Sequence, residues 1–489
     1  MNTDLPNTLY STDQIKTIEQ FVIQSGMVSG YRLMERAGQA VWDYVQHHYP
    51  TVKKITVFCG GGNNGGDGYV VARLARQAGL EVCVYSVVET TGLKNDALTA
   101  YQEFILAGGT VNPFENQVID CDLIIDALLG TGLSRCVTGK YEQAINAINQ
   151  SQVPVISVDV PSGLNCDTGC VMGQAVEADT TITFIGLKQG LFTGFAAQHT
   201  GTIVHASLDL PTAAWETVSS TITCVVSKPL PPRSKYAHKG NFGHVLVVGG
   251  NKGYSGAARL AGMAALRVGA GLVSIATHRD NAAVMNTVCP ELMCHGVCSS
   301  EELAGLLAKA TVVVVGTGLG QDDWATELFQ TVLNTDKPTI VDADALNLLA
   351  KHPRKKPNWI LTPHVGEAAR LLNVSTTAIQ TNRFQAVQQL VGQYGGVALL
   401  KGAGTLIASE NRIAVSTTGN PGMASGGMGD VLAGVIAALL AQGSSLEDAA
   451  KQGAWGHGLA ADLASRDGER GLLATDLLPS LRKWINSLV

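Results

Sequence analysis

The residues best suited to chemistry begin with a glycine-rich loop, Cys59-Gly-Gly-Gly-Asn-Asn-Gly-Gly-Asp-Gly68, which follows a predicted strand and opens a predicted helix. Glycine lets a backbone approach a ligand closely, and the N–H groups at a helix N-terminus attract anions. A merely tight turn would explain one or two glycines, whereas this loop has six. It therefore predicts a phosphate-binding site. It lacks the G-x-G-x-x-G pattern with an acidic residue at the usual distance, so it does not predict ordinary dinucleotide redox chemistry.

Three further segments follow predicted strands in the same half of the chain. They are Asp126-Ala-Leu-Leu-Gly-Thr-Gly132, Asp159-Val-Pro-Ser-Gly163 with Asp167-Thr-Gly169, and Gly186-Leu-Lys-Gln-Gly190. Open α/β sheets bind ligands at the carboxyl ends of their strands. Asn64, Asp126 and Ser162 would bring together only oxygen ligands, which suit a hard cation better than zinc. Either aspartate alone is equally well explained as a helix or turn cap, but two of them facing one glycine loop favour function.

The second half of the chain carries four separated motifs. They are Gly249-Gly-Asn-Lys-Gly-Tyr-Ser-Gly-Ala-Ala258, Thr362-Pro-His-Val-Gly-Glu367, Lys401-Gly-Ala-Gly-Thr405 and Asn420-Pro-Gly-Met-Ala-Ser-Gly-Gly-Met-Gly-Asp430. The last leads into an apolar helix, whose N-terminus would supply N–H donors for phosphoryl oxygens. Asp430, in the first turn, would be a general base beside that anion site. The alternatives are that Asp430 only caps the helix and that His364 is structural; their settings favour function.

These motifs need elements to hold them in place. Helices are predicted from Ser11 or Thr12 to about Ser25 and over residues 31–48, followed by an alternation of strands and helices that indicates parallel sheets. The strands predicted before the boundary are residues 54–59, 81–87, 122–126, 154–158 and 180–184. Those predicted after it are residues 244–248, 272–276, 311–315, 338–341, 359–361 and 397–400, with a hairpin at 405–409 and 412–416. A proline-rich stretch containing Pro229, Pro231 and Pro232 places a domain boundary near residue 228. We therefore expect two unlike α/β domains, residues 1–220 and 228–489.

Composition bounds the class of protein. The chain has 489 residues, of which 46% are hydrophobic and 15% charged, with a net charge of -6. No run of Lys or Arg provides an electrostatic footprint for nucleic acid. No apolar run reaches the ~20 residues of a membrane span, and the first ten residues do not form a secretory signal. The ten cysteines, with Cys166/Cys170 and Cys294/Cys298 too poor in further ligands for zinc, are expected to be free thiols in a cytoplasmic protein.

The first half of the chain, over about residues 10–215, resembles the NAD(P)H-hydrate epimerase family. The resemblance rests on Leu33-Met-Glu-Arg-Ala-Gly38 together with the glycine loop and the segments that begin at Asp126 and Asp159. It implies a Rossmann-like three-layer αβα domain, with potassium held by Asn64, Asp126 and Ser162. Asp159 would be the acid/base residue, with Lys188 a weaker candidate. The implied contacts to hydrated NADH or NADPH are Asn63, Asn64, Gly65, Gly66, Asp67, Gly130, Thr131, Gly132, Leu133, Ser134, Arg135, Cys136 and Asp159.

The second half, over about residues 228–489, resembles the ribokinase-like superfamily and, within it, the ADP- or ATP-dependent NAD(P)H-hydrate dehydratases. The motifs agree closely, including Gly316-Thr-Gly-Leu-Gly320 and Asp342-Ala-Asp-Ala-Leu-Asn347, while Val365 stands where the family usually has proline. The resemblance implies Asp430 as the base, Mg²⁺ as the counter-ion of the nucleotide, and ADP as the expected phosphoryl donor. The implied nucleotide contacts are Lys401, Gly402, Ala403, Gly404, Thr405 and Gly429. The implied hydrate contacts are Ala258, Gly318 or Gly320, His364 and Asp430.

Together the two resemblances predict a repair enzyme that epimerises hydrated NAD(P)H and then dehydrates one epimer. Hydration gives both epimers, so a dehydratase site shaped for one would strand the other unless an epimerase accompanies it. Two alternatives stay open: a small-molecule kinase of the ribokinase superfamily, and a chain whose first domain only binds partners. We expect a homo-oligomer of unspecified size. The preference between NADH and NADPH hydrates and the route of epimerisation are left open.

Overall fold

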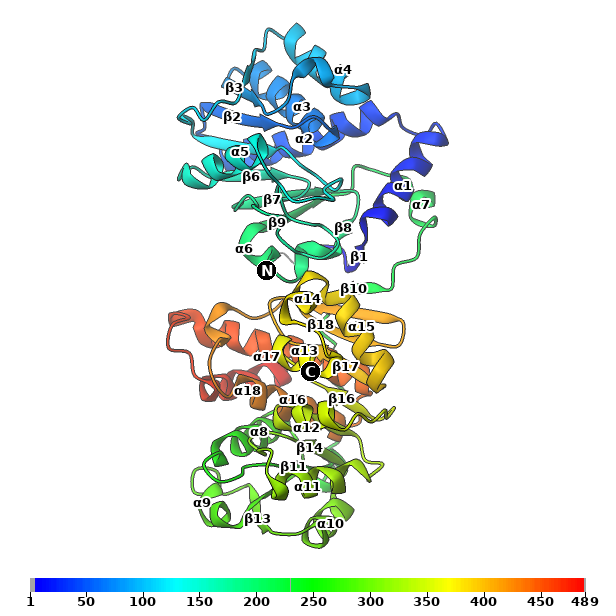
Figure 1. The fold of residues 1–489 in the computed structure, drawn as a ribbon, viewed down its shortest axis with the longest axis vertical. Coiled ribbons are helices and arrows are strands. Elements are labelled where there is room, and N and C mark those ends of the chain that lie inside the picture. The colour runs from blue at the N-terminus through cyan, green and yellow to red at the C-terminus, as the bar shows by residue number, and fades with distance from the viewer. Residues whose placement is uncertain (1–4, 229, 488–489) are drawn as a thin grey trace. The chain divides into compact units, whose positions relative to one another are not determined.

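The computed structural model describes residues 5–228 and 230–487 of the chain. The chain divides into two compact units, Met1–Ile222 and Thr223–Val489 (Figure 1). This division falls a few residues before the boundary near residue 228 that the sequence predicts. Residues 1 and 489, which limit the predicted domains, and Pro229 in the predicted linker lie outside the described residues.

A parallel sheet forms the centre of the N-terminal unit, in the order β4-β3-β2-β5-β6-β7-β9. Its strands are β2 (Lys54–Cys59), β3 (Glu81–Ser86), β4 (Val111–Pro113), β5 (Leu123–Ala127), β6 (Val155–Val158), β7 (Thr180–Phe184) and β9 (Thr202–Ala206). A short parallel pair, β1 (Thr8–Tyr10) and β8 (Leu187–Lys188), lies apart from this sheet. The strand order reverses direction at β2 and β5, which is the place where open sheets of this kind bind ligands.

Helices cover both faces of this sheet. They are α1 (Thr12–Gln24), α2 (Gly30–His48), α3 (Asn63–Gln77), α4 (Asn95–Leu106), α5 (Lys140–Gln150), α6 (Ala196–His199) and α7 (Thr212–Trp215), with the 3₁₀ turns η1 (Thr90–Gly92) and η2 (Gln189–Phe192). Side chains alternate along β2: Val57 joins the core formed with α1–α4, whereas Phe58 joins the core formed with α5. Successive strand residues point to opposite faces, so one strand supports two helical layers. The predicted three-layer αβα arrangement is confirmed.

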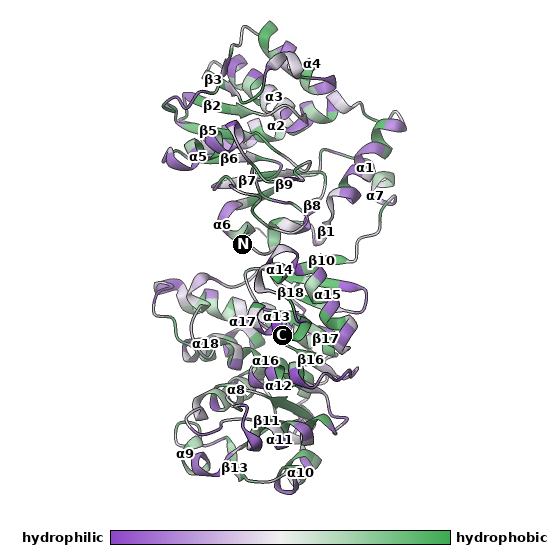
Figure 2. Cartoon of the chain, in the orientation of Figure 1, coloured by the Kyte–Doolittle hydropathy of each residue, from purple (hydrophilic) through white to green (hydrophobic). Residues whose placement is uncertain are grey.

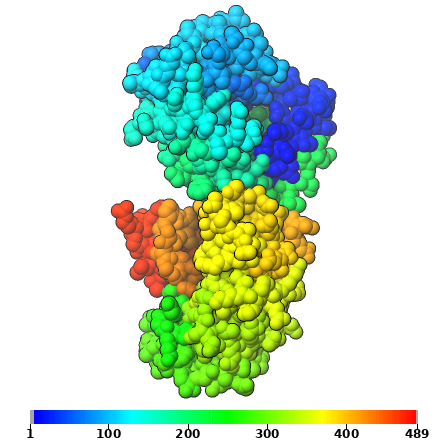
Figure 3. Space-filling view, viewed as in Figure 1, coloured from blue at the N-terminus to red at the C-terminus, as the bar shows by residue number. Residues whose placement is uncertain are grey.

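The first helix begins at a well-formed cap. Ser11 accepts a hydrogen bond from the backbone N–H of Gln14, whose side chain accepts one from the N–H of Ser11. This reciprocal arrangement satisfies two N–H groups that a helix N-terminus would otherwise leave free. Helices α1 and α7 pack together although they lie at opposite ends of the unit's sequence, and their side chains, in dark blue and green, are in contact in the space-filling view (Figure 3).

The sheet of the C-terminal unit runs in the order β13-β12-β11-β14-β15-β16-β17-β18-β19. Its strands are β11 (His244–Val248), β12 (Leu272–His278), β13 (Met293–Val297), β14 (Val312–Val315), β15 (Thr339–Val341), β16 (Trp359–Leu361), β17 (Val397–Leu400), β18 (Thr405–Ser409) and β19 (Arg412–Ser416), while β10 (Ile222–Cys224) lies at the division between the units. Pairing is parallel up to β17 and antiparallel on both sides of β18. The strands are strongly apolar (Figure 2), as parallel strands buried on both faces must be.

The helices of this unit also lie on both faces of its sheet. They are α8 (Ser255–Val268), α9 (Ala282–Met285), α10 (Ser300–Lys309), α11 (Asp323–Leu333), α12 (Asp344–Lys351), α13 (Val365–Leu372), α14 (Thr376–Thr381), α15 (Arg383–Tyr394), α16 (Met428–Ala441), α17 (Leu446–Ala464) and α18 (Leu477–Ser487). The 3₁₀ turns are η3 (Lys239–Phe242), η4 (Arg279–Asn281), η5 (Pro421–Met423), η6 (Ser465–Asp467) and η7 (Ala474–Asp476). The α/β class predicted for both halves is confirmed. Among the described residues, no helix combines the length and apolar character that crossing a membrane requires.

Helix α16 is the centre of the C-terminal core. Apart from Gly429, Asp430 and Ala441, its residues are all buried, and it packs closely against α8. A Cβ atom at Gly434 would lie 2.0 Å from the carbonyl oxygen of Ala261. Only glycine therefore permits the two helix backbones to touch at this position. The contact fixes the depth at which α16, and the loop before it, sit in the unit.

Two candidate active sites

A cavity of about 550 Å³ in the N-terminal unit gathers most of the residues predicted for its site. Its walls come from the segments that follow β2, β5 and β6, together with α1 and α2. The predicted residues that line it are Asn63, Asn64, Asp67, Gly130, Thr131, Gly132, Leu133, Ser134, Arg135 and Asp159. Gly65, Gly66 and Cys136 are not among its lining residues. The cavity therefore lies at the strand ends, as the sequence predicts.

The packing of the glycine loop explains several of its glycines without any ligand. A Cβ atom at Gly60 would lie 1.9 Å from the carbonyl oxygen of Leu128, and one at Gly65 would lie 2.1 Å from that of Gly60. A Cβ atom at Gly66 would lie 2.5 Å from Met34, whereas one at Gly62 would meet nothing within 4 Å. Gly60 and Gly65 are thus required by backbone contacts within the protein, whereas the Met34 side chain could move away from Gly66. The number of glycines alone therefore overstates the case for a phosphate site.

Asp126 and Ser162 meet directly beneath this loop. The fully buried Asp126 carboxylate accepts the Ser162 hydroxyl at 2.5 Å, the Ser157 hydroxyl at 2.7 Å, and the backbone N–H groups of Ser162 and Leu128. Burial raises the pKa of Asp126, and the bonds from Ser162 act in the opposite direction. Asn64 is also buried, and its amide nitrogen has no partner in the described part of the chain. Asp126 and Ser162 are therefore adjacent, and the amide nitrogen of Asn64 is a hydrogen-bond donor without a partner among the described residues.

Asp159 stands on the cavity wall at the end of β6, joined to Lys188 by an ion pair. Three other carboxyl groups line the same space: Glu19 from α1, Asp67 from α3 and Asp96 from α4. Burial, and then the charge of Asp159, raises the pKa of Glu19 and places that of Asp67 well above its usual range. The sequence did not predict Glu19, because it lies on an amphipathic helix with no motif around it and reaches the site only through the fold.

In the C-terminal unit, Asp430 lies in the first turn of α16, three residues after Gly427. Gly427 precedes the helix with a φ of 91°, a backbone conformation that favours glycine. Burial, together with the negative charge of Asp342, raises the pKa of Asp430 to about 7. No side chain caps this helix, so the cap alternative for Asp430 is wrong. A carboxyl group that titrates near neutrality at a helix N-terminus is suited to general base catalysis.

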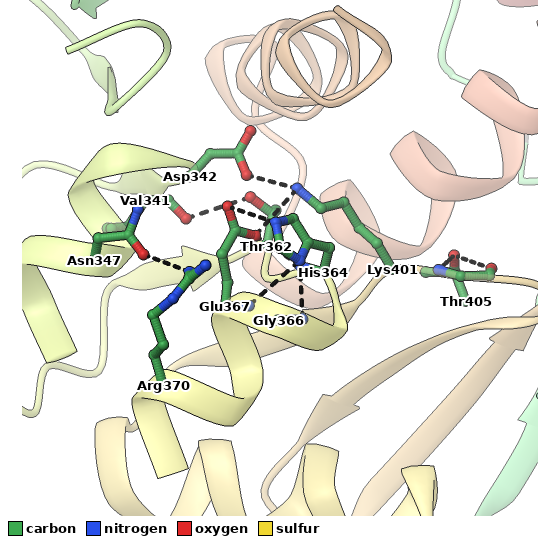
Figure 4. A network of polar contacts seen from close by, with 11 residues as sticks. Val341, Asp342, Asn347, Thr362, His364, Gly366, Glu367, Arg370, Lys401 and Thr405 are labelled. Carbon is green, nitrogen blue, oxygen red and sulfur yellow. Dashed lines mark hydrogen bonds and ion pairs between the residues drawn. The ribbon is translucent and has the colours of Figure 1, made fainter. Parts of the chain in front are cut away.

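Lys401, at the end of β17, lies between two buried carboxylates (Figure 4). Its Nζ is 2.8 Å from an oxygen of Asp342 and 3.7 Å from an oxygen of Glu367. Burial raises the pKa of Glu367 to about 7, although Lys401 opposes the shift. Burial by itself would lower the pKa of Lys401, but Asp342 and Glu367 raise it. The ammonium therefore stays charged beside the start of α16, where a phosphoryl group would need a cation.

His364 is the N-cap of α13, which fixes the state of its ring. Its Nδ1 accepts the backbone N–H of Gly366 at 2.9 Å and that of Glu367 at 3.3 Å. An imidazole nitrogen that accepts hydrogen bonds is unprotonated, so the proton of the neutral ring lies on Nε2. That nitrogen is 3.4 Å from the Glu367 carboxylate. Burial and the charge of Lys401 lower the pKa of His364, which keeps the ring neutral.

The remaining predicted residues surround these groups. Gly318 and Gly320 have left-handed backbones, with φ values of 59° and 78°, and the Gly320 N–H donates to Asp344. Ala258 has no exposed surface, so its contact with the hydrate stays a prediction. Gly402 and Ala403 are exposed in the turn between β17 and β18. A Cβ atom at Gly429 would lie 3.3 Å from Lys401 Nζ, so a larger residue there would crowd the ammonium.

His457 of α17 lies beside the C-terminal candidate site and was not predicted from the sequence. Its ring is buried, its Nε2 has no hydrogen-bond partner in the described part of the chain, and burial lowers its pKa to about 4. It lies near Lys401 and the backbone of Met428, and therefore beside the first turn of α16. Only the pairing of α16 with α17 brings it there, and no motif indicates it.

Comparison with known proteins finds relatives for both halves of the chain. A sequence model described as YjeF-related protein N-terminus matches residues 30–190, and one described as NAD(P)H-hydrate dehydratase matches residues 245–483. A solved structure of a hypothetical protein from Streptococcus mutans aligns with a TM-score of 0.50 and 33% identity, over 53% of this chain and 95% of that one.

Curated relatives match both halves together. A bifunctional NAD(P)H-hydrate repair enzyme from Coxiella burnetii is 47% identical, over 98% of this chain and 99% of its own. The protein of the same name from Escherichia coli K12 is 44% identical, over 99% of this chain and 95% of its own. Because similarity at this level spans both units and both candidate sites, the chain belongs to the family of bifunctional NAD(P)H-hydrate repair enzymes.

Proposed function

We propose that the chain repairs hydrated NADH and NADPH in two steps. The N-terminal unit interconverts the R and S epimers of the hydrate, and the C-terminal unit dehydrates the S epimer at the expense of ADP, giving AMP and phosphate. The observation that carries the proposal is the position of Asp430, in the first turn of α16 with a pKa near 7, beside the Lys401 ammonium. A base and a cation at a helix N-terminus are what phosphoryl transfer to a hydroxyl requires.

The dehydration follows from these groups. Asp430 takes the proton of the ring hydroxyl. The hydroxyl oxygen then attacks the terminal phosphoryl of ADP, and AMP leaves. The N–H groups at the start of α16 and the Lys401 ammonium stabilise the charge on the phosphoryl oxygens. Phosphate is a good leaving group where hydroxide is a poor one. Its departure, with loss of a proton from the neighbouring ring carbon, restores the dihydronicotinamide.

The state of the His364 ring limits the part it can take. With Nδ1 used as a helix cap, His364 presents an N–H from Nε2 and not a free lone pair. It would therefore orient the hydrate by donating a hydrogen bond, and not remove a proton from it. Gly402, Ala403, Gly404 and Thr405, in the turn after Lys401, would contact the nucleotide, with Gly429 beside them. Mg²⁺ would accompany the nucleotide phosphates, as it usually does.

In the N-terminal unit, Asp159 would move the proton of the ring hydroxyl. Epimerisation needs reversible proton transfer at this oxygen, whether the ring opens or hydroxide leaves. The cavity of about 550 Å³ lies within the range of small-ligand sites, so it is large enough to hold the hydrated ring. Asn63, Asp67 and the segment from Gly130 to Arg135, which line it, would bind the rest of the substrate.

Asn64, Asp126 and Ser162 would hold a potassium ion next to this cavity. The donor set is all oxygen and carries one carboxylate, which suits a hard monovalent cation. The adjacency of the Asp126 and Ser162 side-chain oxygens supports the assignment, and Asn64 would contribute its side-chain oxygen, since its amide nitrogen is a donor. An ion there would supply positive charge near the substrate. Replacing potassium by tetramethylammonium should slow epimerisation and leave dehydration of the purified S hydrate unchanged, as measured with one chain in both assays.

The decisive test follows the absorbance of NADH when mixed R and S hydrates are incubated with ADP and Mg²⁺. Wild type should convert all of the hydrate, and Asp430→Ala should convert none. Asp159→Ala should convert the S epimer and then slow to the rate of spontaneous epimerisation. A stable phosphorylated product with no gain in absorbance would instead favour a small-molecule kinase. A cytoplasmic location and a homo-oligomeric state are further predictions, the second open to light scattering on the purified chain.

A further inference from the structure

We infer that Lys188 is a positioning residue that fixes one oxygen of Asp159, so that the other oxygen, Oδ2, is the atom that exchanges a proton with the substrate. This inference rests on the proposed epimerase activity. It departs from the sequence-based prediction, in which Lys188 is a second candidate for acid/base work. The reasons lie in the number of donors that Lys188 has and in what each of them contacts.

The Lys188 ammonium has no donor left for a substrate. A lysine ammonium carries three N–H groups and no acceptor. The Lys188 Nζ donates to Oδ1 of Asp159, to the hydroxyl of Thr183 at 3.0 Å and to the carbonyl oxygen of Phe184 at 2.7 Å. Its side chain is 1% exposed. Three donors therefore have three partners inside the protein, and proton transfer to or from Nζ would break this arrangement.

The contacts of Asp159 are unequal between its two oxygens. Besides Lys188, Oδ1 accepts the backbone N–H of Phe184 at 3.1 Å and the hydroxyl of Thr183 at 3.3 Å. No donor among the described residues contacts Oδ2, and the carboxylate lies on the cavity wall. The lone pairs of Oδ1 are thus already used in hydrogen bonds, one of them charge-assisted. Oδ2 is therefore the oxygen available to a hydroxyl group in the cavity.

The backbone holds the side chain in this direction. Asp159 has a φ of 66°, in the left-handed region that residues other than glycine seldom adopt. Its N–H donates to the carbonyl oxygen of Ile182 on β7 at 2.8 Å. Such a conformation is strained and persists where the surroundings enforce it, often at functional sites. The orientation of the Asp159 carboxylate, and so the position of Oδ2, is thus fixed by the backbone conformation and by the donors to Oδ1.

The charges around the pair show why a cation is needed. Glu19 from α1 and Asp67 from α3 face Asp159, and the Cys166 thiol also lies near it. Burial raises the pKa of both carboxyl groups, and Asp159 raises them further. Lys188 is the positive charge in contact with Asp159. Without it, the Asp159 carboxylate would face the carboxyl groups of Glu19 and Asp67 with no cation in contact. If the ring opens, Oδ2 takes the hydroxyl proton as the bond between the ring carbon and the nitrogen breaks, and returns it when the nitrogen attacks the other face of the carbonyl. If water is lost instead, Oδ2 gives a proton to the departing oxygen and regains it from the water that adds to the other face, so nothing is consumed.

The test is the pH profile of epimerisation, measured on full-length chain with purified R hydrate and no ADP, by chromatographic separation of the epimers. In Lys188→Met, the acid limb of kcat/KM should move to higher pH by about one unit, the usual effect of losing an adjacent opposite charge, while KM changes little. Thr183→Val should move it in the same direction by less. Lys54→Met, which removes a lysine ion-paired with Asp120 outside the cavity, should keep the wild-type profile.

Each other outcome overturns the inference. A uniform loss of rate with the acid limb in place would mean that Lys188 acts on the substrate directly. Disappearance of the basic limb would mean that Lys188 itself titrates in the reaction. If Lys188→Met does not fold, as judged by circular dichroism, Thr183→Val decides the question by the same criterion. If the wild type does not epimerise the R hydrate at all, the proposed function fails and this inference with it, which is a separate and recognisable result.

Discussion

Gly65 lies so close to Gly60 that a Cβ atom on the first would stand 2.1 Å from the carbonyl oxygen of the second. We therefore expect Gly65→Ala to distort the glycine loop, at a cost of about 1–3 kcal/mol typical of overpacking, and to abolish epimerisation. Gly92→Ala is the control, because a Cβ atom there meets nothing within 4 Å and Gly92 is not among the residues that line the cavity. Thermal unfolding and the R-hydrate assay measure both effects. Equal behaviour of the two variants would contradict this account of the loop.

The dehydratase should lose activity in acid because of Asp430. Its pKa is raised to about 7 by burial, and a general base works only when ionised. Below pH 7, kcat/KM for the S hydrate should therefore fall about tenfold per pH unit, and above it the profile should level off. Glu367 also has a pKa of about 7, so Glu367→Gln serves as the control. The acid limb should persist in that variant, and its disappearance would assign the limb to Glu367.

His364 has two proposed roles that substitutions can separate: Nδ1 caps α13, and Nε2 would donate a hydrogen bond to the hydrate. In His364→Asn, the amide oxygen can replace Nδ1 as the acceptor for the N–H groups of Gly366 and Glu367, so the stability of α13 should be retained while KM for the hydrate rises. His364→Ala should raise KM and also lower the free energy of unfolding by about 1 kcal/mol. Steady-state kinetics and urea unfolding distinguish the variants. If asparagine left KM unchanged, Nε2 would have no part in binding.

Removing the Lys401 ammonium should destabilise the C-terminal unit in a pH-dependent way. Its carboxylate neighbours, Asp342 and Glu367, are 2% and 6% exposed, and a buried charge left without its partner costs on the order of 3 kcal/mol. The folded-state pKa of Glu367 lies above its unfolded value. Ionisation of Glu367 therefore opposes folding at pH 8, and protonation relieves this as the pH falls through about 7.

The deficit of Lys401→Met relative to wild type should accordingly be larger at pH 8 than at pH 6, as measured by urea unfolding at both values. Lys228→Met removes a lysine from a surface ion pair with Asp448, where both side chains are well exposed. Such pairs contribute about 1 kcal/mol or less, so this control should show a small loss of stability. A pH-independent deficit in Lys401→Met would show that the loss comes from packing of the lysine stem and not from its charge.

Strong periodic signals made much of the fold predictable. The strands Lys54–Cys59, Thr180–Phe184 and His244–Val248, and the hairpin of β18 and β19, have the predicted bounds, because each is an apolar or alternating run bounded by turn residues. The short strands β1, β8 and β10 were missed, and so were the edge strands β4, β9 and β13. These edge strands are partly exposed, so their sequences carry polar residues that blur the pattern.

The candidate sites were predictable only where local motifs exist. Asp159, Asp430 and Lys401 stand in glycine-rich or strand-end segments that indicate function by themselves. Glu19 and His457 stand on helices with ordinary sequences, and only tertiary packing places them beside those motifs. The full use of the three Lys188 donors and the protonation of the His364 ring at Nε2 depend on hydrogen bonds with backbone groups of other residues. No one-dimensional pattern specifies such bonds.

The contact between Gly434 and Ala261 ties catalysis to the hydrophobic interior. Asp430 begins the same helix one turn earlier, so a side chain at residue 434 that pushed α16 outward would carry the base away from its substrate as well. A variant selected for a better-filled interior at this point would lose turnover before it lost its fold. The catalytic carboxylate belongs to a helix that is positioned by a contact between two backbones. Substitutions at this contact therefore have little scope to increase stability without lowering the rate.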